Sequence, residues 1–126
     1  MNSMVKLFLL LGSMNAACCV GLGAFGAHLL KAKLSEKLFI TYQTGVQYHF
    51  YHTLGFFALA FAAYLIPESL LIKWAGWSMF AGIILFSGSL YLLSVTGVTW
   101  LGAITPIGGV AFIMAWLLLA FAVYKV

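Results

Sequence analysis

Side chains that could bind a ligand or transfer a proton are concentrated in one stretch of the chain, residues 43–52, which reads QTGVQYHFYH. Imidazole and phenol groups can ligate a metal or move a proton, and carboxamides can orient a small polar ligand. Further polar side chains should meet this stretch, because the helices that carry them begin or end in the same half of the protein. The candidate polar cluster consists of His28, Gln43, Gln47, Tyr48, His52, Tyr91 and Thr105.

A metal or haem site is the less favoured interpretation of these histidines. His49 and His52 lie three residues apart, and His28 could supply a third imidazole, but no carboxylate or thiolate accompanies them. Cys18 and Cys19 are adjacent and lack the two-residue spacing of a metal or redox motif. We therefore expect no resident metal and no cofactor.

The sequence also offers no convincing catalytic or nucleotide-binding motif. Two serines, Ser87 and Ser89, lack an acid partner for a histidine base, so no residue is identified as catalytic and we expect the protein not to be an enzyme. Three glycines satisfy GxGxxG, but the strand and the later acidic residue of a dinucleotide site are missing. Small residues allow close helix packing instead. The residues predicted to do so are Gly21, Gly23, Gly26, Ser87, Gly88, Ser89, Gly108 and Gly109.

The composition indicates that helices in a membrane position these side chains. Of the 126 residues, 65% are hydrophobic and 6% are charged, and the mean hydropathy is +1.13, far outside the soluble range. Apolar runs of about 20 residues can each cross the bilayer as a helix. The sequence thus predicts an all-α integral membrane four-helix bundle forming a single domain, residues 1–126, with spans at residues 4–25, 45–65, 71–94 and 105–124.

The most highly charged segment, residues 27–41, is predicted to be amphipathic and to lie in the membrane interface between the first two helices. Its leucines recur every four residues and so form one helical stripe, from which lysines can reach the headgroups: Leu30, Leu34 and Leu38. Within it, Ser35 is a candidate N-cap followed by Glu36 in the first turn. Pro67 should follow the end of the second helix, and Pro106 should lie in the first turn of the last helix.

Lysines do not fix the orientation in the membrane. Four crossings would place Lys6, Lys73 and Lys125 on one side and Lys31, Lys33 and Lys37 on the other. The amino-terminal amine favours the side with both termini as the cytoplasmic one. We expect a multi-pass protein of the cell (inner) membrane. The net charge of +4 comes without a long basic patch, which argues against a nucleic-acid partner.

Five short sequence motifs, spread over nearly the whole chain, resemble those of a known family: GAFGAH, YQTGVQY, HTL, LFSGSLY and TPIGGV. With them the chain resembles the YgdD/YwdK-like family of small inner-membrane proteins, which has eukaryotic relatives and no assigned biochemical activity. The resemblance implies four membrane helices and, for bacterial members, cytoplasmic termini. It also implies Gln in place of His49 in some relatives, which favours His28 and His52 as candidate ligands.

Two functions remain open at this point. The favoured one is a structural or partner-binding role in the membrane, with lipids as partners and the identity of any protein partner unknown. The alternative is a homo-oligomer that binds or conducts a small solute or ion through the polar cluster near one membrane face. The alternative predicts a hydrated cavity that touches His28, Gln47 and His52.

Overall fold

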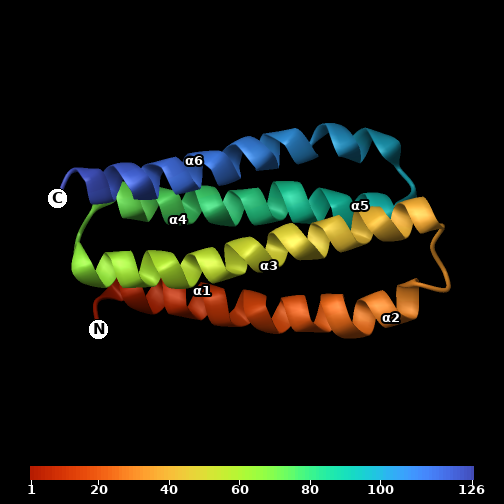
Figure 1. Ribbon diagram of the computed structural model, residues 1–126, viewed down its shortest axis with the longest axis horizontal. Coiled ribbons are helices and arrows are strands. Elements are labelled where there is room, and N and C mark those ends of the chain that lie inside the picture. Colours follow the sequence, from red (N-terminus) through yellow and green to blue (C-terminus); the bar gives the residue numbers. More distant parts are fainter.

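The computed structural model describes residues 1–126, which form helices joined by short turns and run back and forth as four antiparallel rods (Figure 1). Both termini lie at one end, together with the turn between the second and third rods; we call it the terminal end and the other the distal end (Figure 1). The rods are composed, in order, of α1 (Ser3–Val20), η1 (Gly21–Gly26) and α2 (Ala27–Leu30); α3 (Glu36–Leu65); α4 (Leu70–Gly82), η2 (Ile83–Gly88) and α5 (Ser89–Thr96); and η3 (Thr99–Ala103) and α6 (Thr105–Tyr124).

Side-chain caps and helix-breaking residues set the boundaries of the rods. The predicted N-cap Ser35 accepts a hydrogen bond from the Leu38 backbone N–H at 3.2 Å, and Ser69 does the same for Ile72 at 3.4 Å. Gly97 ends α5 in the left-handed region, with φ of 72°, where glycine is unstrained. The last helix begins at Thr105 with a proline in its first turn, as the sequence predicts.

The segment predicted to lie in the membrane interface is not one amphipathic helix. The first rod ends at Leu30, a turn follows, and α3 begins at Glu36, so the leucine stripe is divided between two rods and a turn. The physical reason is the N-cap: Ser35 adopts an extended conformation with ψ of 159°, which interrupts any continuous helix. The charged residues therefore sit on a tight connection at the distal end.

Three of the four rods are long and apolar enough to cross a membrane: Ser3–Leu30, Leu70–Thr96 and Thr99–Tyr124. The first rod runs past the predicted end of its span at residue 25, because the π-helical turn η1 joins α1 to α2 without a break. The turn η2 likewise joins α4 to α5 within the third rod. The second rod, α3, is the longest single helix at 30 residues but is not among the three. It carries the polar stretch of residues 43–52.

Apolar side chains of α1, α3, α4 and α6 form the core. Its largest completely buried side chains are Phe56 and Leu59 of α3 and Ile72 and Met79 of α4. The rod of α1 packs along α3, and α6 packs along α4 and η2. The third rod therefore lies between α3 and α6, and α1 covers the other side of α3 (Figure 1).

Glycines permit the closest crossings, but not all the predicted ones do so. A Cβ on Gly108 would overlap the backbone of Phe86 in η2, so α6 and η2 meet backbone to backbone. Gly26 lies against the Tyr42 hydroxyl group. By contrast, nothing lies within 4 Å of a Cβ placed on Gly21, which is exposed. A Cβ placed on Gly23 would lie 3.0 Å from a neighbouring side chain. A Cβ placed on Gly88 or Gly109 would have no neighbour closer than 3.9 Å.

Candidate functional site

A buried histidine links three rods near the middle of α3. The Nε2 atom of His49 lies 2.9 Å from Oδ1 of Asn15 in α1, and its Nδ1 lies 2.9 Å from the hydroxyl of Tyr91 in α5. Only 5% of His49 is exposed. Three successive rods of the bundle are therefore joined through one imidazole ring.

The direction of each hydrogen bond follows from the carboxamide. The Nδ2 group of Asn15 donates to the Leu11 carbonyl at 2.9 Å, which a carboxamide oxygen could not do. Its Oδ1 must therefore face His49 and accept from Nε2–H. With a neutral ring, the second nitrogen, Nδ1, is an acceptor, and the Tyr91 hydroxyl donates to it. Neutral His49 is thus the Nε2–H tautomer in a chain of hydrogen bonds that runs from Tyr91 to Asn15.

A second pair of side chains extends this cluster towards α1. Thr53 donates its hydroxyl proton to the His49 carbonyl at 2.8 Å, and Sγ of Cys19 lies 3.5 Å from the same hydroxyl oxygen. Since the threonine proton is already used, the Cys19 thiol is the donor. Both side chains are buried, with Thr53 fully enclosed. We call the set Cys19, Asn15, His49, Thr53 and Tyr91 the histidine network.

The π-helical turn of the first rod meets the same region. The Tyr42 hydroxyl donates a hydrogen bond to the Leu22 carbonyl within η1. Gly26 has no side chain and so leaves room for the phenol. The Tyr42 ring lies 5.5 Å from the ring of Tyr91. The GxGxxG segment is therefore a helical turn that receives a tyrosine rather than a nucleotide-binding loop.

His52 occupies a different environment from His49. Its ring stacks on Phe112 of α6 with a centroid distance of 3.4 Å and an interplanar angle of 8°. Its Nδ1 lies 2.7 Å from the Tyr48 carbonyl oxygen, which can only accept, so Nδ1 carries the proton. This histidine joins α3 to α6 by stacking, and its one hydrogen bond stays within α3.

The remaining members of the predicted polar cluster do not gather around either histidine. His28 is exposed. Gln43 and Gln47 line a shallow groove of about 180 Å³ beside the first rod, and Gln47 donates to Tyr51 at 2.6 Å on the exposed surface of α3. In these positions, His28, Gln47 and His52 do not line the predicted hydrated cavity together.

Two other predicted side chains occupy separate places. Tyr48 is partly exposed, and its ring lies 4.5 Å from that of Phe86. Thr105 pairs with Ser89 across the last two rods, with 2.6 Å between their hydroxyl oxygens. The candidate cluster is thus distributed over several helix contacts. Ser87 is fully buried in η2, and its hydroxyl has no partner.

Sequence reasoning missed much of the histidine network. Asn15 was not expected in the site, and His49 was ranked below His52. The available signal was weak: Asn15 is the one carboxamide within an otherwise apolar run, and His49 and Thr53 are spaced one helical turn apart. No three His, Cys, Asp or Glu side chains come together in the structure as a metal site would require.

Comparisons with known proteins agree with the resemblance described above. Residues 22–109 match a family described as protein of unknown function (DUF423). The UPF0382 membrane protein YwdK of Bacillus subtilis is 54% identical over 121 residues, which cover 96% of this chain and 98% of the relative. A UPF0382 membrane protein of Staphylococcus epidermidis is 48% identical over the same shares of both chains. No solved structure matches.

Proposed function

Because the chain belongs to the DUF423 family, whose relatives are named membrane proteins, we propose that it is a multi-pass four-helix bundle of the cytoplasmic membrane with a structural or partner-binding role. In this proposal all four rods cross the bilayer, including α3. The bundle is one domain that presents fixed apolar faces to lipids and neighbouring membrane proteins, and it performs no catalysis.

The histidine network is the observation that carries this proposal. Polar groups in hydrocarbon are costly unless they are paired, and each polar member of the network has a partner from the bundle itself. The polar side chains that lower the hydropathy of α3 include His49, His52 and Thr53, which are turned inward and buried. A helix of this kind can cross a membrane because its neighbours, rather than water, satisfy its polar groups.

Exposed aromatic side chains support a transmembrane arrangement. At the terminal end Tyr64, Trp74 and Tyr124 are exposed, and Trp100 is exposed near the distal end. Tyrosine and tryptophan favour the two membrane interfaces. We place the terminal end in the cytoplasm, because the amino-terminal amine adds one positive charge to a side that otherwise ties in lysine number.

Membrane extraction and cysteine labelling test the arrangement. Single cysteines introduced at Ser3 and at Ala32, in a Cys18→Ser and Cys19→Ser background, should react with an impermeant maleimide from opposite sides of the membrane. Ser3→Cys should be labelled from the cytoplasm and Ala32→Cys from outside. Release of the chain by an alkaline wash, or labelling of both cysteines from one side, would contradict the proposed bundle.

Flux through liposomes distinguishes the structural role from permeation. The groove beside Gln43 and Gln47 is the feature that favours a solute-binding homo-oligomer, since two carboxamides face it. In a structural or partner-binding role, liposomes that contain the protein should release small ions and uncharged solutes no faster than empty liposomes. Flux that Gln43→Leu abolishes would favour permeation instead.

A further inference from the structure

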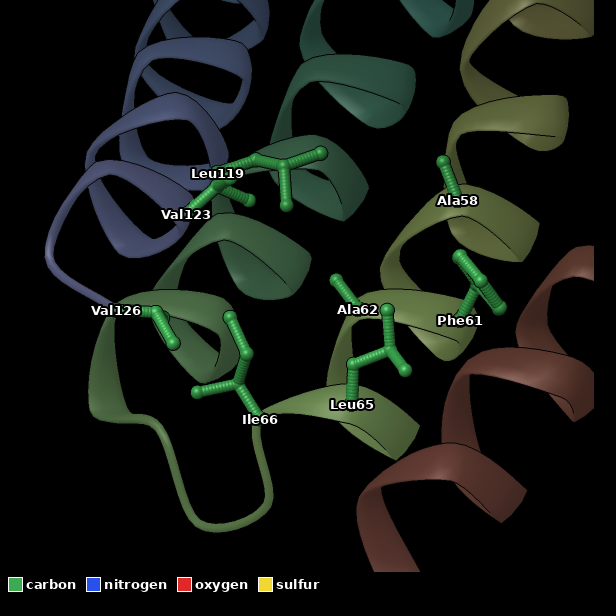
Figure 2. Close-up of a pocket in the computed structure, with 8 residues that line it drawn as sticks. All are labelled: Ala58, Phe61, Ala62, Leu65, Ile66, Leu119, Val123 and Val126. Atoms are coloured by element: carbon green, nitrogen blue, oxygen red, sulfur yellow. The ribbon is translucent and has the colours of Figure 1, made fainter.

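A groove between α3 and α6 at the terminal end is lined entirely by hydrophobic side chains (Figure 2). Its volume is about 470 Å³. Figure 2 shows Ala58, Phe61 and Leu65 of α3 on one side and Leu119 and Val123 of α6 on the other. Water would find no hydrogen-bonding partner here, so an occupant must be apolar where it meets these side chains.

The groove exists because the contact between α3 and α6 changes along their length. Towards the distal end, the His52 ring stacks on Phe112 and lies 5.8 Å from the ring of Trp116, so aromatic side chains fill the space between the helices. Towards the terminal end, α3 presents the small residues Ala58 and Ala62 instead. These methyl groups leave the space between the two helices open.

Charged side chains line a second hollow beside the groove. Ile66 and Val126 border the apolar groove and also a second hollow of about 400 Å³, which Glu68 and Lys125 line as well. The apolar groove therefore adjoins a hollow that offers one cation and one anion. An amphiphile with a long apolar part and a zwitterionic head matches this order.

The length of the groove matches one leaflet of a bilayer. Eight residues separate Ala58 from Ile66, which corresponds to about 12 Å of helix at 1.5 Å per residue. One leaflet contributes about 15 Å, half of a hydrocarbon core of about 30 Å. An acyl chain that starts at the charged hollow would therefore follow the groove through most of its own leaflet. A helix of a second copy would cover the apolar walls but would bring no paired phosphate and ammonium to the hollow.

We propose that this groove binds one acyl chain of phosphatidylethanolamine, with the lipid phosphate at Lys125 and the primary ammonium at Glu68. The inference rests on the transmembrane bundle proposed above and adds a specific lipid site to it. The α3–α6 groove selects an apolar chain. The hollow selects a head in which a phosphate meets Lys125 and an ammonium with N–H groups donates to the Glu68 carboxylate, which a quaternary ammonium cannot do.

Native mass spectrometry of the unchanged protein tests the site. The protein is reconstituted in vesicles of equal parts phosphatidylethanolamine, phosphatidylglycerol and phosphatidylcholine with identical acyl chains, then extracted, and the retained lipids are counted. We expect one retained phospholipid per chain and about a threefold preference for phosphatidylethanolamine, as weak interfacial ion pairs would give. Equal retention of the three lipids by the unchanged protein would overturn the proposal.

Matched variants separate the groove from the hollow. Ala58→Phe should fill the groove and reduce retention of all three lipids, whereas Ala120→Phe, the same change at an exposed α6 position outside the groove, should leave retention unchanged. Glu68→Gln should remove the preference for phosphatidylethanolamine over phosphatidylglycerol, and Lys125→Gln should weaken retention of every phospholipid. Unchanged retention in Ala58→Phe would place the lipid elsewhere and refute the site.

A cysteine in the groove tests for the competing occupant. In a Cys18→Ser background, Ala58→Cys should stay monomeric under oxidation in the membrane if a lipid fills the groove. A disulfide-linked dimer would identify a second copy as the occupant and overturn the lipid site. Loss of the chain from washed membranes would instead refute the transmembrane bundle, so the two proposals fail by different results.

Discussion

The two halves of α3 are held in the bundle by different interactions. Towards the distal end, His49 is hydrogen-bonded to α1 and α5. Towards the terminal end, Phe56 and Leu59 are completely buried and belong to the apolar core with Ile72 of α4. Lipid chains are as apolar as leucine, so burial from water contributes little to helix association in a bilayer. The apolar half therefore depends on close packing, and the polar half depends on paired donors and acceptors.

This difference gives two separate ways to destabilise one helix. Truncating a side chain in the apolar half leaves a cavity, whose cost depends on how far the neighbours can relax. Removing a polar partner in the other half leaves a donor or acceptor unpaired in a medium that offers no replacement. The following variants measure the two effects by the free energy of unfolding in mixed micelles titrated with a denaturing detergent.

Phe56→Ala should have the largest effect, a loss of about 3 kcal/mol, because the ring is fully buried in the apolar core near the Phe8 ring of α1 and its removal leaves a cavity there. Phe50→Ala is the matched control on the same helix, since 42% of Phe50 is exposed and it should cost little. Equal losses in the two variants would mean that the apolar core does not depend on close packing.

His49→Leu should be next, with a loss of about 2 kcal/mol, because it leaves the Tyr91 hydroxyl and the Asn15 carboxamide oxygen without their partner. Gln47→Leu serves as control: Gln47 is exposed and bonds only to Tyr51 of the same helix, so its loss should be below about 0.5 kcal/mol. If Gln47→Leu lost more free energy of unfolding than His49→Leu, Gln47 rather than His49 would be the stabilising polar group.

Tyr91→Phe should lose about 1 kcal/mol, since it removes one interhelical hydrogen bond and keeps the ring. A double-mutant cycle with His49→Leu sharpens this prediction. If the Tyr91 hydroxyl acts by donating to His49, its removal should cost almost nothing once His49 is leucine. Additive losses would show that Tyr91 contributes through another contact.

His49→Gln should have the smallest effect, about 0.5 kcal/mol, because a carboxamide offers one donor for Asn15 and one acceptor for Tyr91. It separates the need for hydrogen-bonding groups from any need for a titratable ring. A loss as large as that of His49→Leu would indicate that the imidazole shape itself, and not only its donor and acceptor, holds the three rods together.

Local signals in the sequence predicted many of the helix boundaries. Ser35 and Pro106 begin helices where capping rules place them, and α3 ends at Leu65, shortly before Pro67. The amphipathic stripe from Leu30 to Leu38 wrongly predicted one helical face, because the four-residue spacing of the leucines continues through a non-helical turn. Periodicity reports which residues could share a helix face, but a single capping residue decides whether the helix exists.

The candidate site was predicted less well than the fold. Helix direction could not separate inward-facing from outward-facing side chains among the predicted tyrosines and histidines. His28 and Gln43 are exposed, whereas Asn15 and Thr53 take part in the histidine network. A rotation of one rod by half a turn exchanges these roles without altering any sequence pattern, so the packing partner must be known.

The sequence by itself determined that this protein is helical and suited to a membrane, because hydropathy, helix caps and proline positions act on neighbouring residues. Only the tertiary structure decided that His49 rather than His52 connects three rods. It also decided that the α3–α6 contact is aromatic at one end and open at the other. Both features depend on the rotation and spacing of helices that are distant in sequence, and those are set by the summed packing of many side chains.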